Sequence, residues 1–140
     1  MRQSILAWAG ALLLAAAVVQ ACAAEPDQQA LDEAVRLGTV AALAPLCGLR
    51  EEAWAFDLRR AAILEATRTG RPEDQALEQA PGSGLVIGAL SFAEAEALED
   101  FAEGTPAKTC GPLRGSPGLA RADEVVRSFR NLKSYMKPAS

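Results

Sequence analysis

The sequence predicts an all-α protein: a small bundle of four helices, orthogonal or up-down, with one disulfide and a signal peptide in front of it. Three observations predict this fold. Apolar side chains recur at helical spacing along four segments. No two segments read as a pair of neighbouring strands, and a lone strand leaves its backbone groups without a sheet partner. Two cysteines remain beyond the apolar N-terminal segment.

The N-terminal segment, residues 1–24, has the parts of a secretory signal peptide. Arg2 is the only charged residue before Glu25, an apolar run covers 5–19, and small residues fill 21–24. The apolar run is shorter than the roughly 20 residues that a membrane-spanning helix needs, and no second run of that length follows. We therefore expect cleavage before Glu25, one helical domain over 25–140 without a transmembrane span, and a periplasmic or secreted location.

Cys22 gives the N-terminal segment a second interpretation. The four residues Val19-Gln20-Ala21-Cys22 resemble a bacterial lipobox, in which Cys22 becomes the lipidated first residue of the exported protein. Gln and Val depart from the residues that are favoured at their positions. Release without an anchor and tethering to a membrane through a lipid on Cys22 both remain open.

Cys47 and Cys110 stay in the chain in either case. The compartment beyond the membrane is oxidising, which favours a disulfide between them. The bridge would close a loop of roughly 60 residues, and restricting the unfolded chain in this way is worth about 4 kcal/mol.

The first two helices are expected over 28–44 and 50–69. Asp27 is a suitable N-cap for the first, and Pro45 should end it. Gly70 and Pro72 form a stop signal after the second. The expected apolar faces are Leu31, Val35, Gly38, Ala41, Ala42 and Leu46 in the first, and Trp54, Leu58, Ala61 and Ala62, widened by Phe56, Ile63 and Leu64, in the second.

The remaining chain should hold two more long helices, over 84–103 and 117–136. A short segment over 72–80 also has helical character, and the Pro- and Gly-rich stretch 105–118 is expected to be a connection. Ser116 is suited to cap the last helix. The expected apolar faces are Leu85, Ala89, Phe92, Ala95, Leu98 and Phe101 in the third helix, and Leu119, Ala122, Val126, Phe129, Leu132 and Met136 in the last.

The absence of histidine from the sequence limits its chemistry. Ser-His-Asp and Cys-His nucleophiles, H-E-x-x-H metalloproteases and imidazole metal sites are excluded. The two remaining cysteines are too far apart for a C-x-x-C redox site. We expect no catalytic residue, no metal and no cofactor. The densest acidic cluster should be a solvated helix face, and consists of Glu94, Glu96, Glu99, Asp100 and Glu103.

Charge is unevenly distributed along the chain. The 14 basic and 18 acidic residues give a net charge of −4, and an acidic protein is a poor binder of nucleic acid. The C-terminal part is nevertheless basic. It can dock on the acidic body or meet an anionic envelope surface or a protein partner, and the expected interaction surface is Arg127, Arg130, Lys133 and Lys137.

Several residues together are similar to a family of small exported alphaproteobacterial proteins of unknown function. They are Leu37-Gly38, Leu43, Pro45-Leu46-Cys47-Gly48, Trp54, Leu58 and Thr109-Cys110. The likeness covers about a third of the chain after the signal segment. The aromatic-rich approach to the second cysteine in that family is missing here. The resemblance implies a signal segment, a helical body and a cysteine pair, and no activity.

These observations favour an exported, non-enzymatic helical protein of the cell envelope that binds a protein or a surface. Two alternatives follow from other residues. A pair of carboxylates could act in a small hydrolase of envelope polymers. Trp54 could lie in the pocket of a small-ligand carrier.

Overall fold

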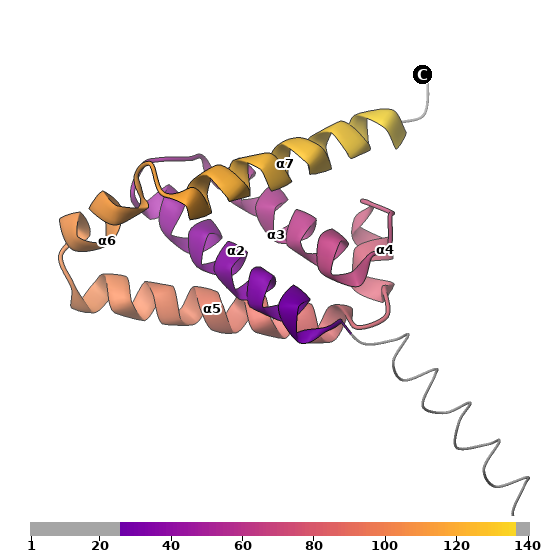
Figure 1. Ribbon diagram of the computed structural model, residues 1–140, viewed down its shortest axis with the longest axis horizontal. Coiled ribbons are helices and arrows are strands. Elements are labelled where there is room, and N and C mark those ends of the chain that lie inside the picture. Colours follow the sequence, from indigo (N-terminus) through magenta and orange to yellow (C-terminus); the bar gives the residue numbers. More distant parts are fainter. Residues whose placement is uncertain (1–25, 137–140) are drawn as a thin grey trace, which may run out of the picture.

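The computed structural model describes residues 26–136. Over this range the chain is entirely helical, without a strand, as Figure 1 shows. The helices are α2 (Gln28–Leu46), α3 (Glu52–Thr67), α4 (Asp74–Gln79), α5 (Ser83–Glu103), α6 (Pro106–Leu113) and α7 (Pro117–Met136). The all-α class is confirmed, but residues 26–136 form six helices where four were expected. None of the helices in this range is both long and apolar enough to cross a membrane.

The two additional helices are short. The first, α4, lies within the segment for which helical character was expected. The second, α6, corrects the prediction of an irregular connection over 105–118. Pro106 occupies the first turn of α6, where a missing backbone N–H costs nothing. Glycine and proline therefore do not exclude one short helix here, and Gly115 then makes the turn into α7 with a positive φ of 74°.

Helix boundaries at capped positions agree with the sequence. The Asp27 carboxylate accepts a hydrogen bond from the backbone N–H of Ala30 at 2.7 Å, and Ser116 Oγ accepts one from Leu119 at 3.1 Å. The expected end of the first helix was wrong, because α2 includes Pro45 in its last turn. A proline there removes one backbone hydrogen bond, and Cys47 still donates to the carbonyl of Leu43.

α2 and α3 lie between α7 and α5 in Figure 1. Their buried faces are rich in alanine, which lets helices approach closely. α2 and α5 approach closely at Gly38 of α2: a Cβ atom at this position would lie 3.1 Å from the carbonyl oxygen of Leu90. The largest fully buried side chains are Phe129, Leu58, Leu77, Val86 and Val125.

α5 is one continuous helix, as the helical phase of its apolar residues predicts. The predicted face was wrong, however. Among the residues assigned to it, Leu85, Phe92 and Leu98 are exposed, and the buried positions are Val86, Leu90, Ala93 and Ala97. Since its first half has no charged residue on any side, periodicity could not tell which side would meet α2.

Candidate functional site

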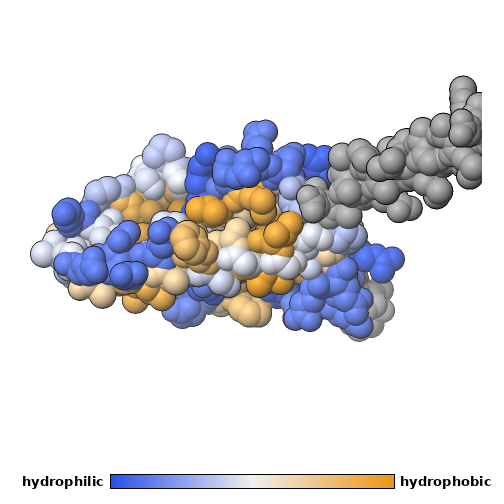
Figure 2. Space-filling view, turned by 90° about the horizontal axis from the view of Figure 1, so that it is seen from below, coloured by the Kyte–Doolittle hydropathy of each residue, from blue (hydrophilic) through white to orange (hydrophobic). Residues whose placement is uncertain are grey.

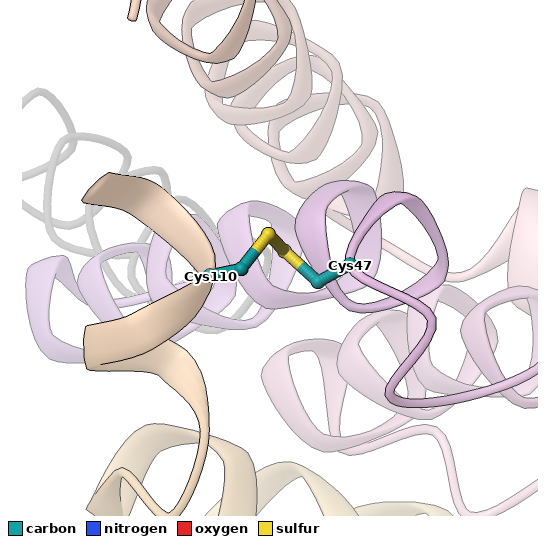
Figure 3. Close-up of a disulfide and its surroundings, with 2 residues drawn as sticks. All are labelled: Cys47 and Cys110. Carbon is teal, nitrogen blue, oxygen red and sulfur yellow. A yellow bond between two sulfur atoms is a disulfide. The ribbon is translucent and has the colours of Figure 1, made fainter. Parts of the chain in front are cut away.

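The disulfide between Cys47 and Cys110 joins the end of α2 to α6. Figure 3 shows the bond between the two sulfur atoms. The Cα atoms of the two cysteines are 5.5 Å apart, and the residues are separated by 63 positions in sequence. This confirms the predicted pair. Because α6 buries none of its residues, the bridge is a main attachment of this helix to the body. Cys22, the candidate for lipidation, lies outside the described residues.

A polar cluster joins α7 to the beginning of α3. The carboxylate of Asp123 accepts hydrogen bonds from Arg50 Nε at 2.9 Å, Arg50 Nη2 at 2.6 Å and Trp54 Nε1 at 3.1 Å. The bonds from Arg50 are the main reason that the pKa of Asp123 is lowered, and the same bonds raise the pKa of Arg50. The indole of Trp54 is otherwise buried in the core. Trp54 therefore holds the fold together rather than offering a free stacking surface.

An open hollow of about 260 Å³ lies beside this cluster. Its lining residues are Leu49, Arg50, Arg114, Gly115, Ser116, Leu119, Ala120 and Asp123. Trp54 is not among them. Arg50 and Asp123 satisfy each other in this wall, so neither offers an uncompensated charge to a ligand.

Three basic residues of α7 reach back to the acidic body or to their own helix. Arg121 donates to Glu33 at 3.1 Å and to Glu65 at 3.2 Å, and the Glu33 bond is the main reason that the pKa of Arg121 is raised. Arg130 Nε donates to Asp57 at 2.8 Å. Lys133 contacts its own helix, because its Nζ lies 5.6 Å from the ring centre of Phe129.

Of the four residues expected to form an interaction surface, Arg127, Arg130 and Lys133 are exposed on α7. Among the described residues Arg127 has no ion-pair partner, whereas Arg130 is engaged with Asp57. Lys137 lies outside the described range. The structure thus places part of the basic surface in contact with the body, as one of the two interpretations of the sequence anticipated.

The acidic cluster of α5 lies on its C-terminal half. Glu94 is bound by Arg59 of α3. The other four carboxylates, Glu96, Glu99, Asp100 and Glu103, are exposed. Asp100 and Glu103 border an open hollow of about 480 Å³ together with Lys108. Between residues 26 and 136 no group of three or more acidic or cysteine side chains is arranged to hold a metal ion.

The outward face of α5 exposes four large apolar side chains. Figure 2 views the protein from the side of α5 and shows apolar side chains gathered across it. The exposed fractions are 51% for Leu85, 38% for Ile87, 62% for Phe92 and 48% for Leu98. Scattered apolar residues are normal on a protein surface, but several along one helix indicate a contact site.

Sequence reasoning missed this face because it assigned Leu85, Phe92 and Leu98 to the core. One signal could have revealed it: residues 83–93 contain no charged side chain. A helix that is apolar on all sides must be covered on all sides, and a domain with so few long helices covers one side of each outer helix only.

No family model, curated protein or solved structure matches this chain.

Proposed function

We propose that this chain is an exported, non-enzymatic helical module of the cell envelope that acts by binding protein through the outward face of α5. The observation that carries the proposal is the exposure of Leu85 and Phe92 on the uncharged first half of α5, continued by Leu98 in its second half. Burying such side chains stabilises a complex by about 25 cal/mol for each Å² of apolar surface removed from water. The disulfide supports the extracytoplasmic part of the proposal.

The basic residues of α7 are a weaker candidate for the binding surface. Arg130 and Arg121 are already paired with acidic residues of α2 and α3, so binding an anionic partner would require breaking these contacts. New exposed ion pairs with such a partner would contribute little in exchange. We therefore place the binding surface on α5 and regard α7 as a helix that docks on the body.

The two other functions that the sequence allowed find less support. A carboxyl group acts as a general acid near neutral pH when an apolar environment favours its protonated form. The free carboxylates of α5 instead face solvent. Trp54 is buried against the core and held by Asp123, outside the hollow next to it, so a ligand carrier would need another pocket.

Photo-crosslinking in cells tests the proposed surface. A photoreactive phenylalanine analogue at Phe92 should give covalent protein adducts on irradiation. The same analogue at Phe56 of α3, which is similarly exposed at 54%, is the matched control and should give few. Equal yields from the two positions, or none from Phe92, would contradict the proposal.

Mass spectrometry of the protein recovered from cells tests its processing. Cleavage before Glu25 and a loss of two hydrogens on oxidation are expected, without further mass. A mass that includes diacylglycerol and an N-terminal acyl chain on Cys22 would establish the membrane-tethered alternative. An intact N-terminus would contradict export by a cleaved signal peptide.

A further inference from the structure

We infer that the occupant of the outward face of α5 is the same face of a second copy of this chain, packed antiparallel about a twofold axis. The inference rests on the proposed function and names its partner. Three features of α5 support it: the spacing of its exposed residues, the open space above two glycines and the distribution of charge along the helix.

α5 carries two seams of residues on opposite sides. The inner seam, which packs on the body, consists of Val86, Leu90, Ala93 and Ala97. The outer seam has the same alternation of four- and three-residue steps, which is the spacing of helices that pair along their length. All of its members are exposed: Gly84, Gly88, Ser91, Ala95, Leu98 and Ala102.

No packing contact within residues 26–136 accounts for the two glycines of the outer seam. A Cβ atom added at Gly84 or Gly88 would meet no atom within 4 Å, and neither has a positive φ. Gly88 lies in the interior of α5, where glycine is unfavourable compared with alanine. On the inner side of α5, by contrast, a glycine has a packing role: Gly38 of α2 makes room for Leu90 of the inner seam. The glycines of the outer seam offer the same room to a side chain from outside.

An antiparallel pairing centred on position 93 fills this room from the same sequence. Position 88 of one chain then faces position 98 of the partner, position 91 faces position 95, and position 84 faces position 102. The partner's Leu98, the one large side chain of the seam, comes to lie on Gly88, as Leu90 lies on Gly38. Twofold symmetry repeats each contact, which is how a self-complementary patch closes a dimer.

The flanking positions are also compatible with this pairing. Phe92 would lie beside the partner's Phe92 across the twofold axis, and Ile87 beside the partner's Phe101. Glu94 would approach the partner's Glu94, but each is neutralised by Arg59 of its own chain. Exposed aromatic side chains at the centre of a contact are typical of residues that dominate binding.

Charge selects the antiparallel orientation. The acidic residues Glu96, Glu99 and Glu103 lie in the C-terminal half of α5, and residues 83–93 have no charge. Parallel helices would bring the acidic halves together. Antiparallel helices place each acidic half beside the uncharged first half of the partner, near the positive end of its helix dipole. A helix of 21 residues is about 30 Å long, which gives a contact at the small end of specific interfaces. We expect association in the micromolar range.

The mass of the processed protein in solution is the first test. Sedimentation velocity between 1 and 500 μM, concentrations chosen to bracket the expected affinity, should show conversion from monomer to dimer. Gly88→Leu should weaken association at least tenfold, because the added side chain occupies the place of the partner's Leu98. Phe92→Ser should also weaken it, whereas Phe56→Ser on α3 should leave it unchanged. A monomer at every concentration would overturn the inference.

Cysteine crosslinking tests the orientation. In the proposed dimer residues 84 and 102 of one chain are about 27 Å apart, at 1.5 Å per residue, and each faces the other position in the partner. Gly84→Cys or Ala102→Cys alone should give little dimer on mild oxidation, and a mixture of the two should give the mixed dimer. Dimer from Gly84→Cys alone would indicate a parallel pairing and contradict the inference. The protein without an added cysteine is the control for any crosslink through Cys22.

The two proposals can fail separately. Adducts from position 92 to a different protein, together with a monomeric purified chain, would overturn the dimer and retain the protein-binding function. Absence of both adducts and dimer would overturn both. The expected result is a dimer whose adducts at position 92 have twice the mass of one chain.

Discussion

The guanidinium group of Arg50 holds the carboxylate of Asp123 with two hydrogen bonds, from Nε to Oδ1 at 2.9 Å and from Nη2 to Oδ2 at 2.6 Å. The two residues are 73 positions apart. The pair fastens α7 to the turn between α2 and α3, and Asp123 also accepts the N–H of Trp54. One carboxylate thus connects three segments, and its ionisation should affect folding.

Asp123→Asn should lower the free energy of unfolding by about 1–2 kcal/mol at pH 7, since asparagine cannot accept both bonds from Arg50. The folded-state pKa of Asp123 is lowered, so the carboxylate stabilises the fold fully above the ordinary Asp pKa of about 3.9. This stabilisation is lost as the pH falls through the folded-state pKa.

Urea unfolding at several pH values checks this prediction. The difference between wild type and Asp123→Asn should shrink below about pH 4. Asp100→Asn is the matched control: Asp100 is exposed and its substitution should change stability by less than about 0.5 kcal/mol. A difference at Asp123 that does not depend on pH would contradict a charge-based role.

The disulfide should act as a unit. Cys47→Ser and Cys110→Ser should each lower the melting temperature. Each should also lower the free energy of unfolding, by up to about 4 kcal/mol for the 63-residue loop. The double variant should resemble either single variant because both changes remove the same bond. Thermal melts with and without reductant measure this, and an additive double variant would show that the thiols stabilise the fold separately.

Reduction should loosen α6 before the rest of the molecule, since none of its residues is buried. Hydrogen exchange of the reduced protein is expected to accelerate over 106–113, whereas the amides of α3 stay protected. Equal acceleration in both helices would mean that the bridge supports the whole fold.

Leu90 and Leu98 are a matched pair on opposite faces of α5. Leu90 is buried and Leu98 is half exposed. Leu90→Ala should cost about 2–4 kcal/mol through lost burial and a cavity, and Leu98→Ala less than about 1 kcal/mol. Chemical denaturation below 1 μM, where the monomer dominates, measures both. The reverse order would place the core on the other face of α5.

Gly38 and Gly88 should respond to alanine in opposite directions. Gly38→Ala brings a methyl group within 3.2 Å of Ala93 and Leu90 and should cost about 1–3 kcal/mol. Gly88→Ala meets no neighbour and should stabilise the monomer by about 0.5–1 kcal/mol through helix propensity. The same denaturation experiment tests both changes, and stabilisation by Gly38→Ala would contradict the close approach of α2 and α5.

The sequence by itself determined the helical class, the bonded cysteine pair and most helix boundaries. The helical class and the helix boundaries depend on residues that are close in sequence, and the cysteine pair follows from the number of cysteines. Asp27 and Ser116 cap helices through their own neighbours, and the apolar spacing of α7 predicts its extent from Pro117 to Met136. Only Cys47 and Cys110 remained to pair once the expected signal segment, residues 1–24, was set aside.

Tertiary structure alone decided which side of α5 is core. Residues 83–93 carry no charge on any side, so the sequence pattern did not single out one face, whereas in the structure Gly38 packs against Leu90. It also decided that Arg121 and Arg130 pair with distant acidic residues and that Asp123 meets Arg50. Such contacts depend on how the helices cross, and the spacing of residues along one helix does not predict this crossing geometry.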